Sequence, residues 1–296
     1  MRLRVGILTL VAMIAFASNS LLCRAALRDT RIDAATFTFV RIFSGAVALW
    51  LILKVRRSTS AGGGNWISAL ALFIYAAAFS FAYKDIPAGT GALLLFGAVQ
   101  ATMILWGFRK GERLDVVQII GLAVAIAGLM VLAFPGLFAP PLIGSMLMLI
   151  AGIAWGAYSL RGKVRGASDT GGGLPFDAIA ATAGNFLRAV PFAALISIVM
   201  LREMHLDSLG IIYAIISGAI TSGLGYVIWY AVLPDLKSAS AATVQLSVPV
   251  LAAAGGILFL SEPLTFRYLL ASIAVLGGIF LVVIERERGA KRTITK

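Results

Sequence analysis

Cysteine, histidine and acidic residues are all scarce in this sequence. Its 296 residues include one cysteine, Cys23, one histidine, His205, and only 13 Asp and Glu residues. A lone cysteine excludes an intramolecular disulfide and any metal cluster built from cysteines. The histidine lies alone in a polar connector, and no two acids share a buried segment, so the side-chain clusters needed for acid–base or metal catalysis are missing. We therefore expect no catalytic residue, no metal site and no cofactor, which argues against an enzyme.

Charge of either sign is also sparse. Charged residues make up 13% of the chain and hydrophobic residues 60%, whereas a soluble domain carries roughly 25% charged and 45–50% apolar residues. The apolar residues form long runs, as is typical of an integral membrane protein. The net charge of +12 comes from short basic clusters between these runs. No basic amphipathic face accompanies them, so we expect the lipid bilayer, and no nucleic acid, as a partner.

Ten apolar segments can be distinguished, each near the ~20 residues that cross a bilayer as a helix. They are continuous rather than alternating, which favours helices over a β-barrel. If the N-terminus is cytoplasmic, most basic connector residues are cytoplasmic too, and the connector with Arg24, Arg28 and Arg31 is the exception. We predict an all-α integral membrane protein with ten transmembrane helices and both termini cytoplasmic, multi-pass in the inner (plasma) membrane. The predicted spans are 5–23, 35–53, 66–83, 87–106, 116–134, 142–160, 176–200, 208–232, 238–260 and 264–284.

The second half of the sequence repeats the first. IAFASNSL at 14–21 matches IAWGAYSL at 153–160, and FVRIFSGA at 39–46 matches FLRAVPFA at 186–193. Five spans in each half is an odd number, so the second half must enter the bilayer from the opposite side. We expect an inverted 5+5 repeat with units 1–138 and 139–296. Inverted repeats of this kind usually belong to transporters, which bind their substrate near the bilayer midplane.

A glutamate precedes the last span of each half. Glu112 stands in FRKGERLD among basic residues, and Glu262 stands at the matching place in FLSEPLTF without them. A carboxylate at the start of a helix complements the positive end of the helix dipole, and Pro263 suits the first helical position. We predict that Glu112 and Glu262 are structural caps of the helices that follow them. A substrate or ion role is the alternative.

These features together resemble a known family. Ten spans in two halves, each half closing with a Glu-x-Leu turn (Glu112 with Leu114, Glu262 with Leu264), resemble the drug/metabolite transporter superfamily and, within it, the EamA-like permeases. The resemblance covers almost the whole chain and, within that family, extends to the aromatic amino acid exporter branch. It implies that spans 1, 3, 4, 6, 8 and 9 surround a central cavity and that spans 5 and 10 lie to one side.

Candidate substrate-binding residues are the polar and aromatic residues inside the spans. Arg41 and Arg188 could bond helix carbonyls or snorkel, or could bind a substrate carboxylate. The Asn and Gln amides and the Tyr and Trp rings within the spans could make contacts between helices, or they could line a cavity suited to neutral or aromatic amino acids. Pro191 and Pro249 are predicted hinges because proline interrupts a helix. The full set of binding candidates is Asn19, Arg41, Tyr75, Gln100, Trp155, Tyr158, Arg188, Trp229 and Gln245.

The function that these residues indicate is export of a small-molecule substrate by alternating access. All 13 Asp and Glu residues lie in connectors or at span ends, which favours facilitated diffusion or exchange over a proton relay, although a peripheral acid could still couple protons. The alternatives are a membrane-embedded enzyme acting on lipid or isoprenoid substrates and a permease for nucleosides or drugs. The sequence leaves the oligomeric state open between monomer and homodimer.

Overall fold

The structure is a computed structural model that describes residues 2–56, 63–111, 115–133, 140–168, 178–232, 236 and 244–294. Within these residues the regular structure is helical, and there is no strand. The elements are α1 (Arg2–Asp29), α2 (Ala34–Val55), α3 (Trp66–Ala82), α4 (Ala88–Arg109), α5 (Val116–Ala133), α6 (Leu142–Ser168), α7 (Ala178–Val199), the 3-10 helix η2 (Leu201–Glu203), α8 (Ser208–Ile215), the π-helix η3 (Ile216–Leu224), α9 (Gly225–Val232), α11 (Ser247–Leu260) and α12 (Phe266–Ile294).

The helices have the length and composition of membrane spans. In the part of the chain that the structure describes, seven helices are long and apolar enough to cross a bilayer, and three shorter apolar helices accompany them. Large hydrophobic side chains cover the outside of the bundle, and Ile143, Leu258 and Phe259 are 76%, 76% and 78% exposed. Such a surface suits lipid and not water. The chain is therefore a multi-pass helical membrane protein.

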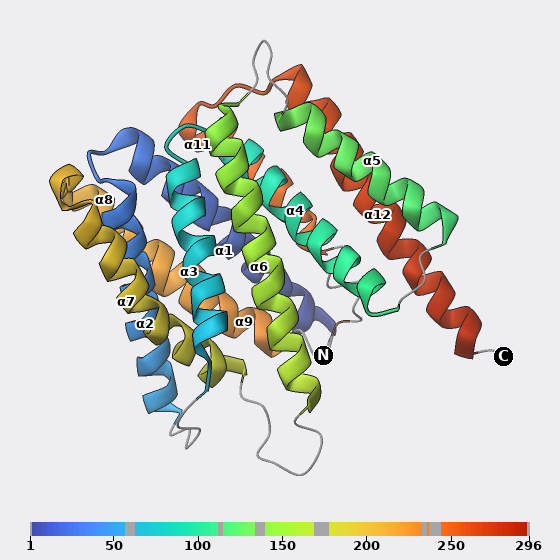
Figure 1. Ribbon diagram of the computed structural model, residues 1–296, viewed down its shortest axis with the longest axis horizontal. Helices are drawn as coiled ribbons and strands as arrows, with labels where there is room; N and C mark the ends of the chain where they lie inside the picture. Colours follow the sequence, from blue (N-terminus) through green and yellow to red (C-terminus); the bar gives the residue numbers. More distant parts are fainter. Residues whose placement is uncertain are drawn as a thin grey trace.

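The interior of the bundle lies between the two halves of the chain. The helix α2 packs against α7 and η3, and α3 packs against α6 and α7. Likewise α4 packs against α6 and α11, while α1 contacts α11, α9 and η3. Figure 1 shows α5 and α12 lying along each other at one side of this arrangement. Gly121 and Gly278 permit this close pairing, because a Cβ at Gly121 would lie 2.6 Å from the Gly278 carbonyl oxygen.

The predicted span 208–232 is not a uniform α-helix. It consists of α8, then the nine-residue π-helix η3, then α9. π-Helical segments are rare and often occur at functional sites. The sequence ISGAITSGL in this segment is rich in small residues, which allow η3 to pack closely on α1 and α2.

Pro191 and Pro249, the two predicted hinges, lie in helices that continue past them. The helix α7 continues through Pro191 without interruption, where the missing N–H leaves the Leu187 carbonyl without its usual helical donor. Pro249 is the third residue of α11, and N–H groups in the first turn of a helix have no intrahelical acceptor, so proline costs little there. Among the described residues, η3 rather than either proline is the irregular segment within a span.

Asp33 joins the start of α2 to the connector that follows α7. Its Oδ1 accepts a hydrogen bond from the Thr36 amide at 2.9 Å, and its Oδ2 accepts one from the His205 amide at 3.0 Å. Burial by itself raises the pKa of this carboxyl, but the hydrogen bonds from Thr36, His205 and Ala35 outweigh it and hold the pKa below the ordinary 3.8.

The lowered pKa of Asp33 predicts a loss of stability in acid. Its contribution is fully present above the unfolded-state pKa and is lost as the pH falls through the lower folded-state pKa. Between about pH 5 and 3, we expect the melting temperature in detergent to fall more steeply for the wild type than for Asp33→Asn. Thermal unfolding of both proteins across this range is the measurement. Parallel curves would show that Asp33 contributes nothing to the pH dependence.

Candidate functional site

A cluster of buried polar residues lies in the interior between the two halves. This central polar cluster comprises Asn19 of α1, Arg41 of α2, Tyr75 of α3, and Ser217 and Thr221 of η3, and all five are buried. Asn19 Oδ1 accepts a hydrogen bond from Ser217 Oγ at 2.6 Å, and Thr221 Oγ1 lies 3.3 Å from the same oxygen. Asn19 Nδ2 donates to the Tyr75 hydroxyl at 3.4 Å. Four helical segments from both halves thus meet in one hydrogen-bonded group.

The cluster lies near the middle of the helices that supply it. In α3 (17 residues), nine residues precede Tyr75 and seven follow it, which corresponds to about 14 Å and about 11 Å of helix at 1.5 Å per residue. Tyr75 therefore lies near the middle of a helix that spans most of a hydrocarbon core about 30 Å thick. Polar residues at this depth are costly and typically mark a substrate or ion pathway.

Arg41 is the charged member of the central polar cluster and is 2% exposed. Its Nη2 donates to the Tyr75 hydroxyl at 3.0 Å. The guanidinium lies over the Phe79 ring at 4.8 Å and the Tyr75 ring at 5.3 Å, an arrangement that stabilises a cation. Its Nη1 is buried and has no hydrogen-bond partner among the described residues.

Aromatic rings stack beside the cluster. The Trp155 ring of α6 lies 4.8 Å from Tyr75, 5.2 Å from Tyr226 and 5.4 Å from Tyr158 between centroids. Phe16 packs edge-on against Tyr226 and Trp229. The structure therefore brings Tyr75, Trp155, Tyr158 and Trp229, four of the sequence candidates, into one aromatic stack that borders the central polar cluster.

The matching arginine, Arg188, is bonded differently from Arg41. Its Nη1 donates to the main-chain oxygens of Gly63 at 2.9 Å and Gly184 at 3.0 Å. Beside it, Asn185 Nδ2 donates to the Tyr158 hydroxyl at 3.3 Å, and Asn185 Oδ1 accepts from the Asn65 amide at 2.8 Å. This second group holds α7 against the start of α3, and Arg188 has the carbonyl-bonding role that the sequence left as one of its two readings.

Two candidate amides lie outside the central polar cluster. Gln100 is buried in α4, and Gln245 is half-buried in the short stretch before α11. Among the described residues no hydrogen bond joins either side chain to Asn19, Arg41 or Tyr75. Both therefore remain predictions, with no hydrogen bond to the central polar cluster within the described residues.

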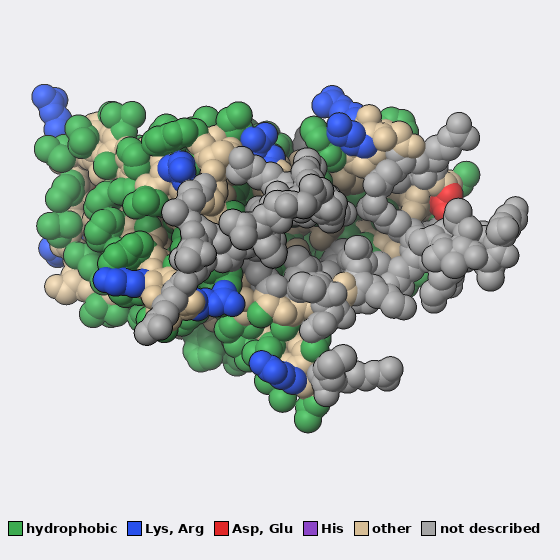
Figure 2. Space-filling model, turned by 90° about the horizontal axis from the view of Figure 1, so that it is seen from below, with side chains coloured by type: hydrophobic (Ala, Val, Ile, Leu, Met, Phe, Trp, Pro, Cys, Tyr) green, Lys and Arg blue, Asp and Glu red, His purple; other side chains and the backbone are tan. Residues whose placement is uncertain are grey.

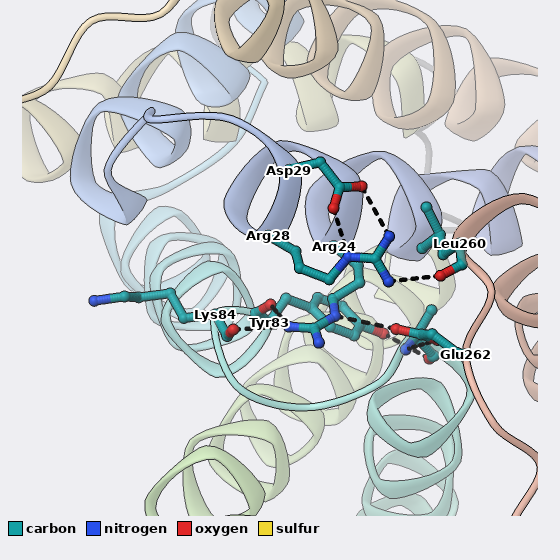
Figure 3. Close-up of polar contacts among 8 residues, drawn as sticks. Arg24, Arg28, Asp29, Tyr83, Lys84, Leu260 and Glu262 are labelled. Atoms are coloured by element: carbon teal, nitrogen blue, oxygen red, sulfur yellow. Dashed lines mark hydrogen bonds and ion pairs between the residues drawn. The ribbon is translucent and has the colours of Figure 1, made fainter.

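The connection between α11 and α12 runs along the upper end of the bundle in Figure 1. Glu262 in this connection belongs to a network that also contains Arg24 and Arg28. Its Oε1 pairs with Arg24 Nε at 3.0 Å, and its Oε2 accepts the amide N–H of Ala88, the first residue of α4, at 2.8 Å. Arg24 Nη1 donates to the Tyr83 and Lys84 carbonyls at 2.9 and 2.7 Å. As Figure 3 shows, Arg28 reaches the Leu260 carbonyl at the end of α11.

The helix that Glu262 caps is not the one predicted from the sequence. We expected Glu262 to cap the following helix, α12, but its carboxylate serves the N-terminus of α4. At α12 a neighbouring residue, Thr265, accepts the Tyr268 amide at 3.2 Å. Pro87, at the N-cap of α4, makes no side-chain cap hydrogen bond, and a carboxylate from a distant segment supplies that acceptor. Glu112, the other predicted cap, lies outside the described residues.

The same network accounts for the exceptional connector after the first span. Arg24 and Arg28 satisfy carbonyls at the ends of α3 and α11, and Arg24 also pairs with Glu262. Cations near a helix C-terminus are favourable. These two arginines therefore have specific partners in the fold, which explains why they depart from the general distribution of basic residues among the connectors.

A cavity of about 270 Å³ lies at this end of the bundle, between α4, α11 and α12. Asp85, Thr90, Glu262 and Tyr268 are among its lining residues. None of the five residues of the central polar cluster lines it. The cavity and the cluster are therefore separate features of the same interior.

Sequence reasoning missed Ser217 and Thr221. Neither was among the candidate residues, although the two hydroxyls stand four residues apart in an apolar span. Residues four apart share one face of a helix, and this spacing could have indicated a polar stripe. Their partner, Asn19, could not have been identified without the fold.

Together these observations define a class of protein. A multi-pass helical protein whose buried polar and aromatic residues meet at mid-depth between two halves has the features of a membrane transporter. The model of the EamA-like transporter family matches residues 4–134 and again residues 142–284. The chain belongs to the EamA-like transporter family, and this membership indicates a transporter rather than an enzyme.

Individual relatives match nearly the whole chain. The chain is 53% identical over 291 residues to an uncharacterized protein of Pseudomonas aeruginosa, covering 98% of each chain. It is 26% identical over 287 residues to the "Probable amino-acid metabolite efflux pump" of Escherichia coli (strain K12), covering 94% of each. A solved crystal structure superimposes with a TM-score of 0.66 at 16% identity, covering 96% of this chain and 98% of that one, and so shares the fold.

Proposed function

We propose that this protein exports small amphipathic metabolites, specifically neutral or aromatic amino acids, across the inner membrane. The observation that carries the proposal is the central polar cluster, where Asn19 of the first half bonds Ser217 of the second half beside the aromatic stack. A site shared by both halves is opened or closed when the halves move against each other, as alternating access requires. The name of the Escherichia coli relative supports both the amino-acid substrate and the outward direction.

The proposal includes a membrane arrangement. The halves 1–138 and 139–296 form an inverted repeat of five spans each, with both termini cytoplasmic. Two observations support it: the family model matches once in each half, and the helix contacts correspond when the halves are exchanged. The contacts of α6 with α3 and α4 have counterparts in the contacts of α1 with η3 and α9 and with α11.

The distribution of basic residues supports the same orientation. Exposed Lys and Arg residues stand at the lower ends of α2, α4 and α6 in Figure 1, and Figure 2 shows such side chains spread over the face seen from below. Basic residues gather on the cytoplasmic side of membrane proteins. The residues at these helix ends are Lys54, Arg56, Arg109, Lys110 and Arg161.

The transport mode in this proposal is exchange or facilitated diffusion. The polar groups that meet at the centre are one cation, an amide and hydroxyls, and the Asp and Glu residues of the sequence lie in connectors or at span ends rather than at mid-span. Membrane-embedded acids are the usual carriers in proton relays. In this mode the substrate gradient drives net flux outward.

Counterflow in proteoliposomes tests the proposal. Vesicles preloaded with an unlabelled neutral or aromatic amino acid should accumulate its radiolabelled form. Asn19→Leu, which removes the amide between the halves, should lower this uptake by about tenfold, since a factor of ten corresponds to 1.4 kcal/mol. Thr102→Val is the matched control, because within the described part of the chain the Thr102 hydroxyl bonds only the Ala98 carbonyl of its own helix, at 2.7 Å.

Other results of the counterflow experiment would contradict particular parts of the proposal. Flux of nucleosides or sugars alone would remove the amino-acid assignment and leave the transport function. Formation of a product without flux would support the membrane-embedded enzyme. Equal counterflow by Asn19→Leu and wild type would show that the central polar cluster lies off the substrate pathway.

A further inference from the structure

Arg41 stands out as a buried cation with unused hydrogen-bonding capacity. Its side chain is 2% exposed, Nη2 is bonded to the Tyr75 hydroxyl at 3.0 Å, and Nη1 has no partner in the described part of the chain. Buried guanidinium N–H groups are almost always hydrogen-bonded. An unfilled donor on a charged group at mid-depth therefore indicates a place for a ligand.

No carboxylate of the described residues pairs with Arg41. The salt bridges found there join Arg24 to Glu262 and Arg28 to Asp29, and both involve the last two turns of α1. The sequence places its acids in connectors and at span ends, away from residue 41. A buried charge without a counter-ion is unfavourable, so an anionic ligand would supply what the protein itself leaves out.

The groups around Arg41 are hydrogen-bond donors. The Tyr75 oxygen already accepts from Arg41 Nη2 and from Asn19 Nδ2, which leaves its own proton for donation. Ser217 donates to Asn19 Oδ1 at 2.6 Å and so turns the amide nitrogen of Asn19 toward Tyr75. Guanidinium, hydroxyl and amide donors thus converge, and an ionised carboxylate only accepts hydrogen bonds.

The aromatic stack indicates which chemical group the ligand carries beside its carboxylate. Tyr75 belongs both to the cluster and to the stack, and Trp155 lies 4.8 Å from it between ring centroids. Trp155 in turn stacks on Tyr226 at 5.2 Å. A molecule that places a carboxylate at Arg41 would therefore rest an apolar or aromatic group against these rings.

We propose that Arg41, with Tyr75 and Asn19, binds the carboxylate of the transported molecule, so that the substrates are small organic acids with an apolar or aromatic group. This inference rests on the proposed transport function and names the feature by which the same site selects its substrate. Arg188 has no such role, because its Nη1 is bonded to the Gly63 and Gly184 carbonyls.

Competition in the counterflow assay tests the inference. Labelled phenylalanine is the substrate, and the competitors are phenyllactate, phenylalaninamide and phenethylamine. Phenyllactate keeps the carboxylate and lacks the ammonium group, whereas the amide and the amine keep the ammonium group and lack the carboxylate. We expect phenyllactate to compete at least about tenfold better than phenylalaninamide and phenethylamine, because those two compounds lose the charge-assisted hydrogen bond to Arg41.

Variants separate Arg41 from a general effect on folding. In Arg41→Gln, the preference for phenyllactate over phenylalaninamide should fall toward one, and Arg41→Lys should restore part of it. Arg188→Gln, at the matching place in the other half, should leave this ratio unchanged whatever it does to the amount of protein. If Arg41→Gln does not fold, the competitor series on the wild-type protein decides by itself.

Two results would overturn the inference. One is equal competition by the amide, the amine and the acid in the wild type, and the other is an acid preference that survives in folded Arg41→Gln. In both cases phenylalanine counterflow persists, so the transport proposal stands while the carboxylate site falls. Absence of counterflow with any amino acid or organic acid would instead remove the transport proposal and the carboxylate site with it.

Discussion

Replacing Glu262 by alanine is expected to destabilise the protein by about 3 kcal/mol or more, since removing one partner of a buried ion pair leaves an uncompensated charge. Arg24 and Glu262 have side chains that are only 12% and 7% exposed. The substitution also leaves the Ala88 amide, at the start of α4, without its acceptor at 2.8 Å. Thermal unfolding in a fixed detergent measures the effect, and Glu262→Gln should lose less because it keeps an acceptor for Ala88.

A double-mutant cycle isolates the pair itself. Arg24→Ala and Glu262→Ala should be strongly coupled, with a coupling energy above about 1 kcal/mol. Asp29→Asn is the matched control on the same helix, because the Arg28–Asp29 pair is 32% and 43% exposed. Such exposed pairs contribute about 0–1 kcal/mol. Additive effects of the two alanines would mean that Arg24 and Glu262 act independently, each through its own backbone contacts.

Adding a single methyl group at Gly218 is expected to abolish most transport. A Cβ at this position of η3 would contact the Arg41 carbonyl and the Ser44 hydroxyl, and it would lie 2.8 Å from the Arg41 carbonyl carbon. Backbone atoms cannot rotate away, so η3 must move off α2. Overpacking of this kind costs about 1–3 kcal/mol. The shift would also displace Ser217, whose hydroxyl bonds Asn19 at 2.6 Å.

The same substitution elsewhere in η3 is the control. A Cβ at Gly223 would meet its nearest atom, the Gly218 carbonyl oxygen, at 3.4 Å, which is an ordinary contact. We expect Gly218→Ala to lower counterflow by about tenfold or more and Gly223→Ala to change it by less than about twofold, as the contact distances imply. Normal transport by Gly218→Ala would show that the packing of η3 on α2 is not needed for function.

Much of the helical architecture could be predicted from the sequence. The predicted spans 35–53 and 87–106 became α2 (Ala34–Val55) and α4 (Ala88–Arg109). An apolar run of membrane length has few alternatives, since lipid offers no partner for its backbone groups and a helix satisfies them internally. The span 208–232 was harder, because the π-helix in it depends on packing against α1 and α2 and not on the composition of the segment alone.

The candidate site was predicted only as a set of residues. Asn19, Tyr75, Trp155 and Trp229 were singled out as candidates within apolar spans. The structure places Asn19 and Tyr75 in the central polar cluster with Arg41, and Trp155 and Trp229 in the adjoining aromatic stack. Gln100 and Gln245 were equally unusual in the sequence and lie outside the cluster. A polar residue in an apolar run must have some partner, but the run does not specify whether that partner is a neighbouring helix or a ligand.

The sequence alone therefore determined that the chain is an apolar helical membrane protein with two similar halves, because lipid imposes helices on each segment separately. The tertiary structure decided which side chains meet. Arg41 and Arg188 occupy matching places in the two halves. Yet Arg41 faces Tyr75 with one donor that has no partner among the described residues, whereas Arg188 bonds main-chain carbonyls. Glu262 likewise caps α4 instead of α12. Such pairings depend on contacts between segments far apart in the chain, which local composition does not encode.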